Sequence, residues 1–277
     1  MKQVEKRRMC PNCRAFITTD DKICPYCQVE VGPKAAVRLN PAGALGGLIP
    51  HARFTTMMIL LINTGLYLAT VVHSYQSGSG TGMDIDSATL FDFGAKYRAA
   101  IWAGQWWRLV TAGFLHGGLI HILMNSWVLF DLGAQVEEHY GTARYIVLYF
   151  VSTVTGFLAS SYWSPALSIG ASAGILGLIG AMIAVGVRDR SSYGAAMRSV
   201  YMRWVFYIIL IGLLPIFATD NAAHIGGLAG GFVIAYICGT PGYSAAKERI
   251  WQIAAGLALG ITGLAFAQMF LWMTSQK

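Results

Sequence analysis

The sequence of 277 residues is 55% hydrophobic but only 12% charged, and its mean hydropathy is +0.52. Soluble domains carry about 25% charged residues, so this composition excludes an ordinary soluble protein and predicts that lipid surrounds most of the chain. The net charge of +7 does not indicate nucleic-acid binding, because the basic residues gather at segment ends and in the N-terminal tail.

Residues 1–33 are expected to form a small zinc-ribbon-like module. Cys10 and Cys13 make one C-x-x-C pair and Cys24 and Cys27 make a second, with ten residues between the pairs. Four thiolates are the ligand set of a closed tetrahedral Zn²⁺ site, which leaves no position for a substrate, so we expect structural zinc. A thiol redox pair is the alternative, but no βαβ pattern surrounds the cysteines.

The N-terminus shows no cleavable signal sequence, because Met1–Arg8 is charged and is followed by cysteines rather than by an apolar core. The fifth cysteine, Cys238, lies in an apolar run, so the cysteines indicate a metal site in a reducing compartment and not a disulfide framework. Residues 34–53 are rich in Gly, Pro and Ala and are expected to form a linker.

Seven apolar segments follow, each near the length that crosses a bilayer as a helix. Their expected limits are Phe54–His73, Leu119–His139, Ala143–Trp163, Gly170–Val187, Arg203–Ala218, Ala222–Gly239 and Ile250–Met273. Basic residues gather before the first span and after the fourth and sixth, with Arg198 and Arg203 expected in the loop after the fourth. The positive-inside rule then places the N-terminus in the cytoplasm. Residues 74–118, rich in aromatic side chains, are expected to lie as a loop in the outer membrane interface.

Two stripes of small residues predict that the fourth and sixth spans pack closely. The first stripe is Gly170, Gly174, Gly177 and Ala181, and the second is His224, Gly227, Gly231 and Ala235. Such packing would bring Ser172 to His224 near the outer ends of both helices, where an imidazole can take the proton of a serine hydroxyl. The alternative for His224 is a structural hydrogen bond between helices. A Gly-x-Ser-x-Gly nucleophile elbow needs a preceding strand, which two hydrophobic spans exclude.

A third polar group lies at the start of the second span. His121 and Asn125 are four residues apart and therefore share one helix face, and His116 precedes them. Polar side chains at membrane depth usually face a cavity or a partner, although plain hydrogen bonding between helices is an open alternative.

The residues from about Gly104 to Gly239 resemble the rhomboid family of intramembrane serine proteases. The resemblance rests on five motifs in order, which are Trp107-Arg108, His116 with His121 and Asn125, Gly133 with Glu137 and Gly141, Gly170-Ala171-Ser172-Ala173, and Ala223-His224 with Gly227 and Gly231. It implies an all-α membrane protein with a rhomboid core of six transmembrane helices in residues 54–240 and a seventh transmembrane helix in residues 241–277.

The resemblance also implies roles for individual residues. Ser172 would be the nucleophile and His224 the general base, with an oxyanion hole formed by the Ser172 N–H and the side chains of His121 and Asn125. The implied supporting residues are His116, Arg108, Glu137, Gly170, Gly227 and Gly231. Catalysis would need no cofactor, and the substrates would be transmembrane proteins cleaved near the outer membrane face.

One position departs from the family pattern. Leu176 stands where the family commonly has an aromatic residue stacked on the catalytic histidine, so His224 is expected to be held less firmly. Two other functions remain to be separated from proteolysis: a non-catalytic adaptor that binds membrane proteins, and a transporter. The size and N-terminus favour a bacterial inner membrane. The sequence names neither a substrate nor a protein partner of the zinc module.

Overall fold

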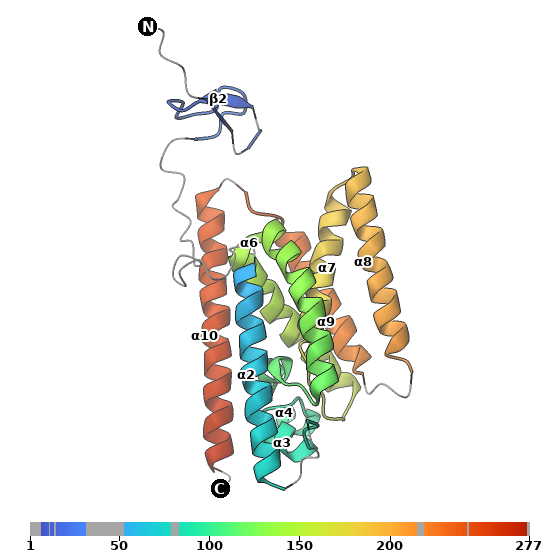
Figure 1. Ribbon diagram of the computed structural model, residues 1–277. Coiled ribbons are helices and arrows are strands. Elements are labelled where there is room, and N and C mark those ends of the chain that lie inside the picture. Colours follow the sequence, from blue (N-terminus) through green and yellow to red (C-terminus); the bar gives the residue numbers. More distant parts are fainter. Residues whose placement is uncertain are drawn as a thin grey trace. The chain divides into compact units, whose positions relative to one another are not determined.

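The computed structural model describes residues 7–10, 12–13, 15–31, 53–78, 83–214, 219–242 and 244–275. The chain divides into two compact units, Met1–Leu48 and Ile49–Lys277 (Figure 1). The predicted linker 34–53 lies outside the described residues except for Arg53, so the predicted domain limits stay predictions.

The N-terminal unit is built on a two-stranded antiparallel sheet. Strand β1 (Arg7–Met9) pairs with β2 (Phe16–Thr18), and Met9 lies opposite Phe16. The buried apolar side chains of this unit belong to Cys10, Ile17, Cys24 and Val31. A core this small stabilises little by itself, which agrees with a module that depends on a metal.

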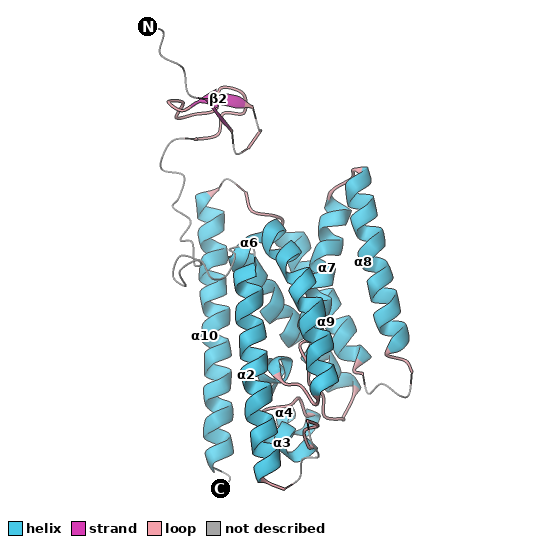
Figure 2. Ribbon diagram, in the orientation of Figure 1, coloured by secondary structure: helices cyan, strands magenta, loops and turns pink. Residues whose placement is uncertain are grey.

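The second unit consists of helices joined by loops (Figure 2). Its long helices are α2 (Phe54–Gln76), α6 (Leu119–Trp163), α7 (Ser172–Arg188), α8 (Ser192–Ile211), α9 (Asn221–Cys238) and α10 (Ala245–Ser275). The connection between α2 and α6 contains the short helices α3 (Ser87–Asp92), α4 (Arg98–Trp102), α5 (Arg108–Thr111) and η2 (Ala112–Phe114). Among the described residues, five helices are long and apolar enough to cross a membrane, and α7 is a shorter apolar helix.

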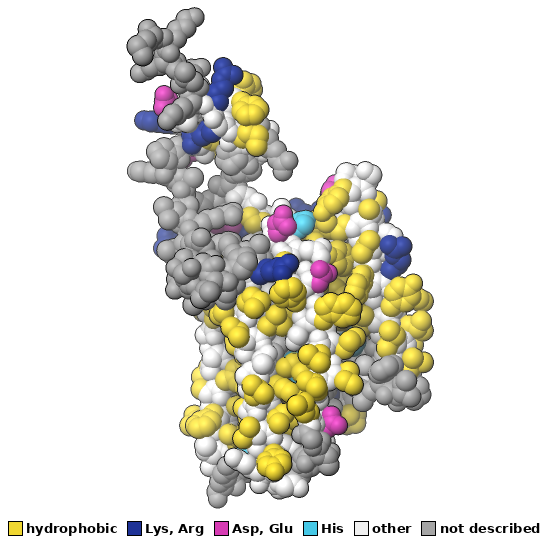
Figure 3. Space-filling model, in the orientation of Figure 1, with side chains coloured by type: hydrophobic (Ala, Val, Ile, Leu, Met, Phe, Trp, Pro, Cys, Tyr) yellow, Lys and Arg dark blue, Asp and Glu magenta, His cyan; other side chains and the backbone are white. Residues whose placement is uncertain are grey.

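Helix α6 contains two of the predicted spans. Gly141 has φ 71° and ψ 164°, a conformation that glycine adopts readily, and it interrupts the helix. The predicted segments Leu119–His139 and Ala143–Trp163 lie on either side of this break. The architecture is therefore the predicted one, a six-helix core followed by a C-terminal helix. On the face drawn in Figure 3, hydrophobic side chains cover the helices over most of their length, as contact with lipid requires.

The predicted span Arg203–Ala218 is wrong in its limits, because α8 begins at Ser192 and ends at Ile211. The Ser191 hydroxyl accepts the N–H of Gly194 at 3.3 Å and caps the helix early. Arg198 and Arg203 therefore lie on α8 and not in a loop. Residues 215–218, at the end of the predicted span, lie outside the described residues.

Helix α7 is the centre of the helical unit and packs against α6, α8 and α9. A Cβ atom on Gly227 of α9 would collide with the carbonyl of Ala173, and one on Gly231 would collide with the carbonyl of Gly177. The backbones of α7 and α9 are thus in direct contact, which only glycine permits here.

The predicted stripe on α7 is partly wrong. Gly180 and the backbones of Ala173 and Gly177 meet α9, although a Cβ atom on Gly177 would first collide with Ser152 of α6. A Cβ atom on Gly174 would meet Tyr149 of α6. The rotation of α7 about its axis decides which small residues face α9. The remaining small residues allow close packing against α6 instead.

Candidate active site

Ser172 and His224 meet at the ends where their helices begin. Ser172 is the first residue of α7, and His224 lies in the first turn of α9. The Ser172 Oγ and the His224 Nε2 are 3.0 Å apart, within hydrogen-bond distance. The His224 side chain is buried, and its Nδ1 has no hydrogen-bond partner among the described residues. No carboxylate among the described residues therefore orients the imidazole directly.

Gly170 sets the approach of the chain to Ser172. Its φ of +125° is one that other residues rarely adopt, and its N–H donates to the carbonyl of Ala112 at 2.9 Å. A Cβ atom there would lie only 2.8 Å from the His121 Nε2. The glycine thus allows both the backbone turn and the close approach of His121.

The predicted group at the start of α6 lies on the other side of the same site. The Asn125 side chain is buried, and its Nδ2 donates to the His121 carbonyl at 2.9 Å. The rings of His116 and His121 meet edge to face with centroids 5.1 Å apart. His116 is buried and both its ring nitrogens lack a hydrogen-bond partner among the described residues, so it supports His121 by packing.

A cavity of about 850 Å³ connects these groups. The polar side chains that line it include those of His121, Asn125, Ser168, Ser172, Asp220 and His224. Leu176, at the position that is commonly aromatic in the family, is buried and also lines the cavity. The structure therefore brings together both histidines of the predicted site, the asparagine and the serine.

Two charged residues near the site, the buried Lys96 and the half-buried Asp220, escaped the sequence prediction. The Lys96 Nζ donates to the carbonyls of Ser164 at 2.7 Å and Ala166 at 3.0 Å, and the Lys96 backbone pairs with Ser168. Burial lowers the pKa of Lys96, which a negative charge on Asp220 opposes. Lys96 thus holds the loop between α6 and α7, one wall of the cavity, and no local pattern around it indicates this role.

Asp220 caps the helix that carries His224. Its carboxylate accepts the N–H of Ala223 at 3.0 Å and the hydroxyl of Ser160. Burial raises the pKa of Asp220, but the hydrogen bonds from Ser160 and Ala223 outweigh burial and hold this pKa below its ordinary value. An Asp directly before an apolar segment is an N-cap signal that a sequence reading can use.

The two predicted supporting charges lie away from the cavity. The buried Arg108 guanidinium donates to the carbonyls of Phe91 at 2.7 Å and Ala95 at 2.9 Å, inside the loop before α6. Glu137 accepts the N–H of Thr55 at 3.1 Å and the hydroxyl of Thr142 at 2.8 Å. Arg108 therefore ties one loop together, and Glu137 ties the first turn of α2 to the break in α6.

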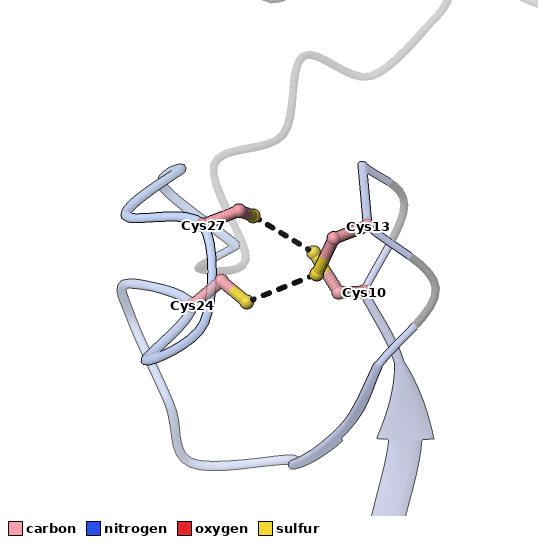
Figure 4. Close-up of side chains that lie close together, drawn as sticks. All are labelled: Cys10, Cys13, Cys24 and Cys27. Carbon is pink, nitrogen blue, oxygen red and sulfur yellow. Dashed lines mark hydrogen bonds between the residues drawn. The ribbon is translucent and has the colours of Figure 1, made fainter.

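The four N-terminal cysteines form a separate cluster (Figure 4). Their sulfur atoms all lie within 4.8 Å of one another, with Cys10 and Cys27 3.7 Å apart and Cys13 and Cys24 3.6 Å apart. Zinc–sulfur bonds of about 2.3 Å in a tetrahedron place sulfur atoms about 3.8 Å apart. The cluster therefore has the donor set and the spacing to hold a metal ion such as Zn²⁺.

Comparison with known proteins addresses the helical unit. A family model described as the Rhomboid domain matches residues 103–241, half of the chain. The chain belongs to the rhomboid family. The matched region contains every cavity-lining residue named above, but not Lys96, the cysteine cluster or α10.

Named rhomboid relatives come from bacteria, plants and a parasite. The chain is 35% identical to the Rhomboid protease GluP of Bacillus subtilis (strain 168) over 201 residues, 72% of this chain and 39% of that protein. It is 35% identical over 156 residues to RHOMBOID-like protein 6, mitochondrial, of Arabidopsis thaliana, covering 54% of this chain and 50% of the relative. It is 35% identical over 153 residues to Rhomboid-like protease 3 of Toxoplasma gondii, covering 54% of this chain and 57% of the relative. This rhomboid thus spans about half the length of these relatives.

Proposed function

We propose that this rhomboid is a serine endopeptidase that cleaves transmembrane proteins, with Ser172 as nucleophile and His224 as general base. The observation that carries the proposal is the 3.0 Å separation of the Ser172 Oγ and the His224 Nε2 inside a cavity. A serine is activated when an adjacent base can take its proton, and this pair has that geometry. The relatives named as proteases support the same activity.

The reaction would proceed by acyl transfer. As the Ser172 Oγ attacks the scissile carbonyl, His224 Nε2 takes the hydroxyl proton and then gives it to the leaving amine. Water then attacks the acyl-enzyme, with His224 again as the base, and releases the new carboxyl end together with free Ser172. The cavity beside the dyad has room for both the peptide and this water.

The oxyanion would be bound by the Ser172 N–H at the start of α7 and by the side chains of His121 and Asn125. The start of a helix presents free N–H groups and favours negative charge. The Asn125 and His121 side chains line the same cavity from the opposite helix. Donors placed in advance around a developing negative charge are usually the largest single contribution to catalysis.

The substrate and the membrane face are proposed on the same grounds. Arg188 ends α7, at the opposite end of the helix from Ser172, so the positive-inside rule puts Ser172 near the outer face. A substrate would be a transmembrane segment whose small residues let it unwind into the cavity. We assign the chain to a bacterial inner membrane with a cytoplasmic N-terminus, which a reporter fused to the N-terminus would test.

The test of the activity is cleavage of a model transmembrane substrate in liposomes together with labelling by a fluorophosphonate probe. We expect Ser172→Ala to lose both cleavage and labelling. Ser164→Ala is the matched control, because Ser164 lines the same cavity without approaching His224, and it is expected to keep both. Labelling that persists in Ser172→Ala would reject Ser172 as the nucleophile. A wild-type protein that is neither labelled nor able to cleave would leave the non-catalytic adaptor as the function.

For the N-terminal module we propose structural zinc bound by Cys10, Cys13, Cys24 and Cys27. The residues would hold the metal as thiolates, and the metal would supply cross-linking and no chemistry on the substrate. The full-length protein should contain one zinc per chain by elemental analysis. Cys24→Ser should lower this content while probe labelling of Ser172 persists, and unchanged zinc in that variant would contradict the site.

A further inference from the structure

A second cavity lies between α6 and α8, away from the dyad. Its volume is about 400 Å³, and aromatic, aliphatic and polar side chains line it. Those that matter here are Trp127, Val128, Asp131, Gln135, Tyr201 and Trp204. Val128 also lines the cavity that holds Ser172, so the two cavities follow one another along the same seam.

Helices α6 and α8 make few contacts with each other along the seam between them. Helix α8 packs chiefly against α7. Among the described residues, the one side-chain hydrogen bond across the seam runs from the Tyr201 hydroxyl to the Gln135 Oε1 at 2.8 Å. A segment bound beside Ser172 can therefore continue along the seam into the second cavity.

Asp131 is the unusual residue of this cavity. It is exposed, and its carboxylate makes no hydrogen bond or ion pair with any other residue that the structure describes. It lies twelve residues into α6, about 18 Å from the start of the helix, so it is well inside the predicted span. An ionisable side chain at such depth is costly unless a partner meets it, which marks it as a candidate binding group.

The chemistry of the cavity selects a cation. Trp127 and Trp204 line the same cavity as the carboxylate, and the faces of tryptophan rings attract ammonium and guanidinium groups. The apolar walls would also cover the aliphatic part of a long basic side chain. A carboxylate and two indoles together fit lysine or arginine better than any neutral side chain.

We infer that this cavity is a subsite for a lysine or arginine side chain within the transmembrane segment of the substrate. The inference rests on the proposed function, because the occupant is the segment that Ser172 cleaves. Asp131 pairs with the cation, and Trp127 and Trp204 contact it. The substrates selected in this way are helices that carry a basic residue inside the bilayer.

The spacing of the two cavities gives the position of that residue. Asn125 lines the first cavity and Asp131 the second, and six residues of helix rise about 9 Å. On α7, Ser172 lines the first cavity and Ile179 lines the second, and seven residues of helix rise about 10 Å. A substrate that unwinds at the cleaved bond and is helical beyond it therefore places its basic residue about seven positions beyond that bond, toward the inner face.

The test measures binding of two transmembrane peptides to the Ser172→Ala protein in nanodiscs of neutral phosphatidylcholine. Both peptides carry one stretch of small residues as the expected cleavage site. One peptide has Lys seven positions beyond this stretch, and the other has Met there. We expect the Lys peptide to bind about tenfold more tightly, a change that corresponds to about 1.4 kcal/mol. Asp131→Asn should abolish this preference, whereas Glu138→Gln, an exposed carboxylate on the same helix that does not line the cavity, should keep it.

Equal binding of the two peptides, or a preference that survives Asp131→Asn, would overturn the inference. The binding measurement needs no cleavage, so the subsite and the protease activity can be rejected independently. A Lys preference without any cleavage by the wild-type protein removes only the protease, and cleavage without a preference removes only the subsite.

Discussion

Helices α7 and α8 follow one another in the chain but are held in opposite ways. Helix α7 is made largely of Gly, Ala, Ile and Leu and is buried along nearly its whole length. Helix α8 has only Gly194, Met197 and Tyr201 buried and exposes bulky side chains such as Phe206 and Tyr207. The serine is therefore on the most firmly packed helix, while the seam beside it is closed by a helix with few buried contacts.

This difference shows that separate helices fix the position of Ser172 and control access of a substrate to it. Backbone contact with α9 fixes Ser172 relative to His224, because glycine leaves neither helix room to shift. Helix α8 has few buried side chains and packs chiefly against α7, so we expect it to move away from α6 at low cost. Four substitutions test the two halves of this comparison.

The largest effect is expected for Gly231→Val in the contact between α7 and α9. The added side chain would collide with the carbonyl of Gly177, which cannot yield as a side chain can. Overpacking of this kind costs about 1–3 kcal/mol or more and would separate Ser172 from His224. Thermal unfolding in detergent and substrate cleavage should both fall sharply, and an active, stable variant would refute the tight contact.

Asn125→Ala is expected to come next, on the α6 side of the cavity. Losing one oxyanion donor typically lowers the rate about 10²–10³-fold. The variant should keep weak cleavage and normal unfolding temperature, whereas Ser172→Ala abolishes cleavage. Single-turnover cleavage in liposomes measures the rate. Full activity would remove Asn125 from the proposed oxyanion hole.

Asp220→Asn tests the cap that holds the start of α9. The pKa of Asp220 is lowered in the folded protein, so its charge stabilises the fold at pH values above the ordinary carboxyl pKa of about 3.9. That contribution is lost as the pH falls through the lowered value. Melting temperatures from pH 7 to pH 3 should therefore converge for wild type and Asp220→Asn at the acid end. A gap that widens toward low pH would contradict this sign.

The smallest effect is expected for Tyr201→Phe on α8. The change removes one hydrogen bond across the seam, typically worth about 1 kcal/mol, and leaves the packing of the ring. Stability should fall slightly while cleavage is retained or rises, because substrate enters more easily. Phe206→Ala, an exposed residue on the same helix, serves as control. A loss of cleavage in Tyr201→Phe would show that α8 also fixes the site.

The sequence alone determined which segments cross the membrane, because lipid makes hydrophobic length a local property that needs no knowledge of neighbours. It also determined the four-cysteine cluster, since two C-x-x-C pairs place their thiolates through short loops. The sequence also predicted the serine, both histidines and the asparagine of the cavity, because glycine stripes and the family motifs marked the helices that carry these residues.

Only the tertiary structure decided how each helix is rotated and where α8 begins. Gly174 faces α6 and not α9, although its spacing fits the stripe, because rotation depends on every neighbour of α7 at once. Lys96 and Asp220 become part of the site through partners about sixty to seventy residues away, at Ser164 and Ser160. The cavity beside Asp131 likewise exists only between helices, so no periodicity in one segment could have indicated it.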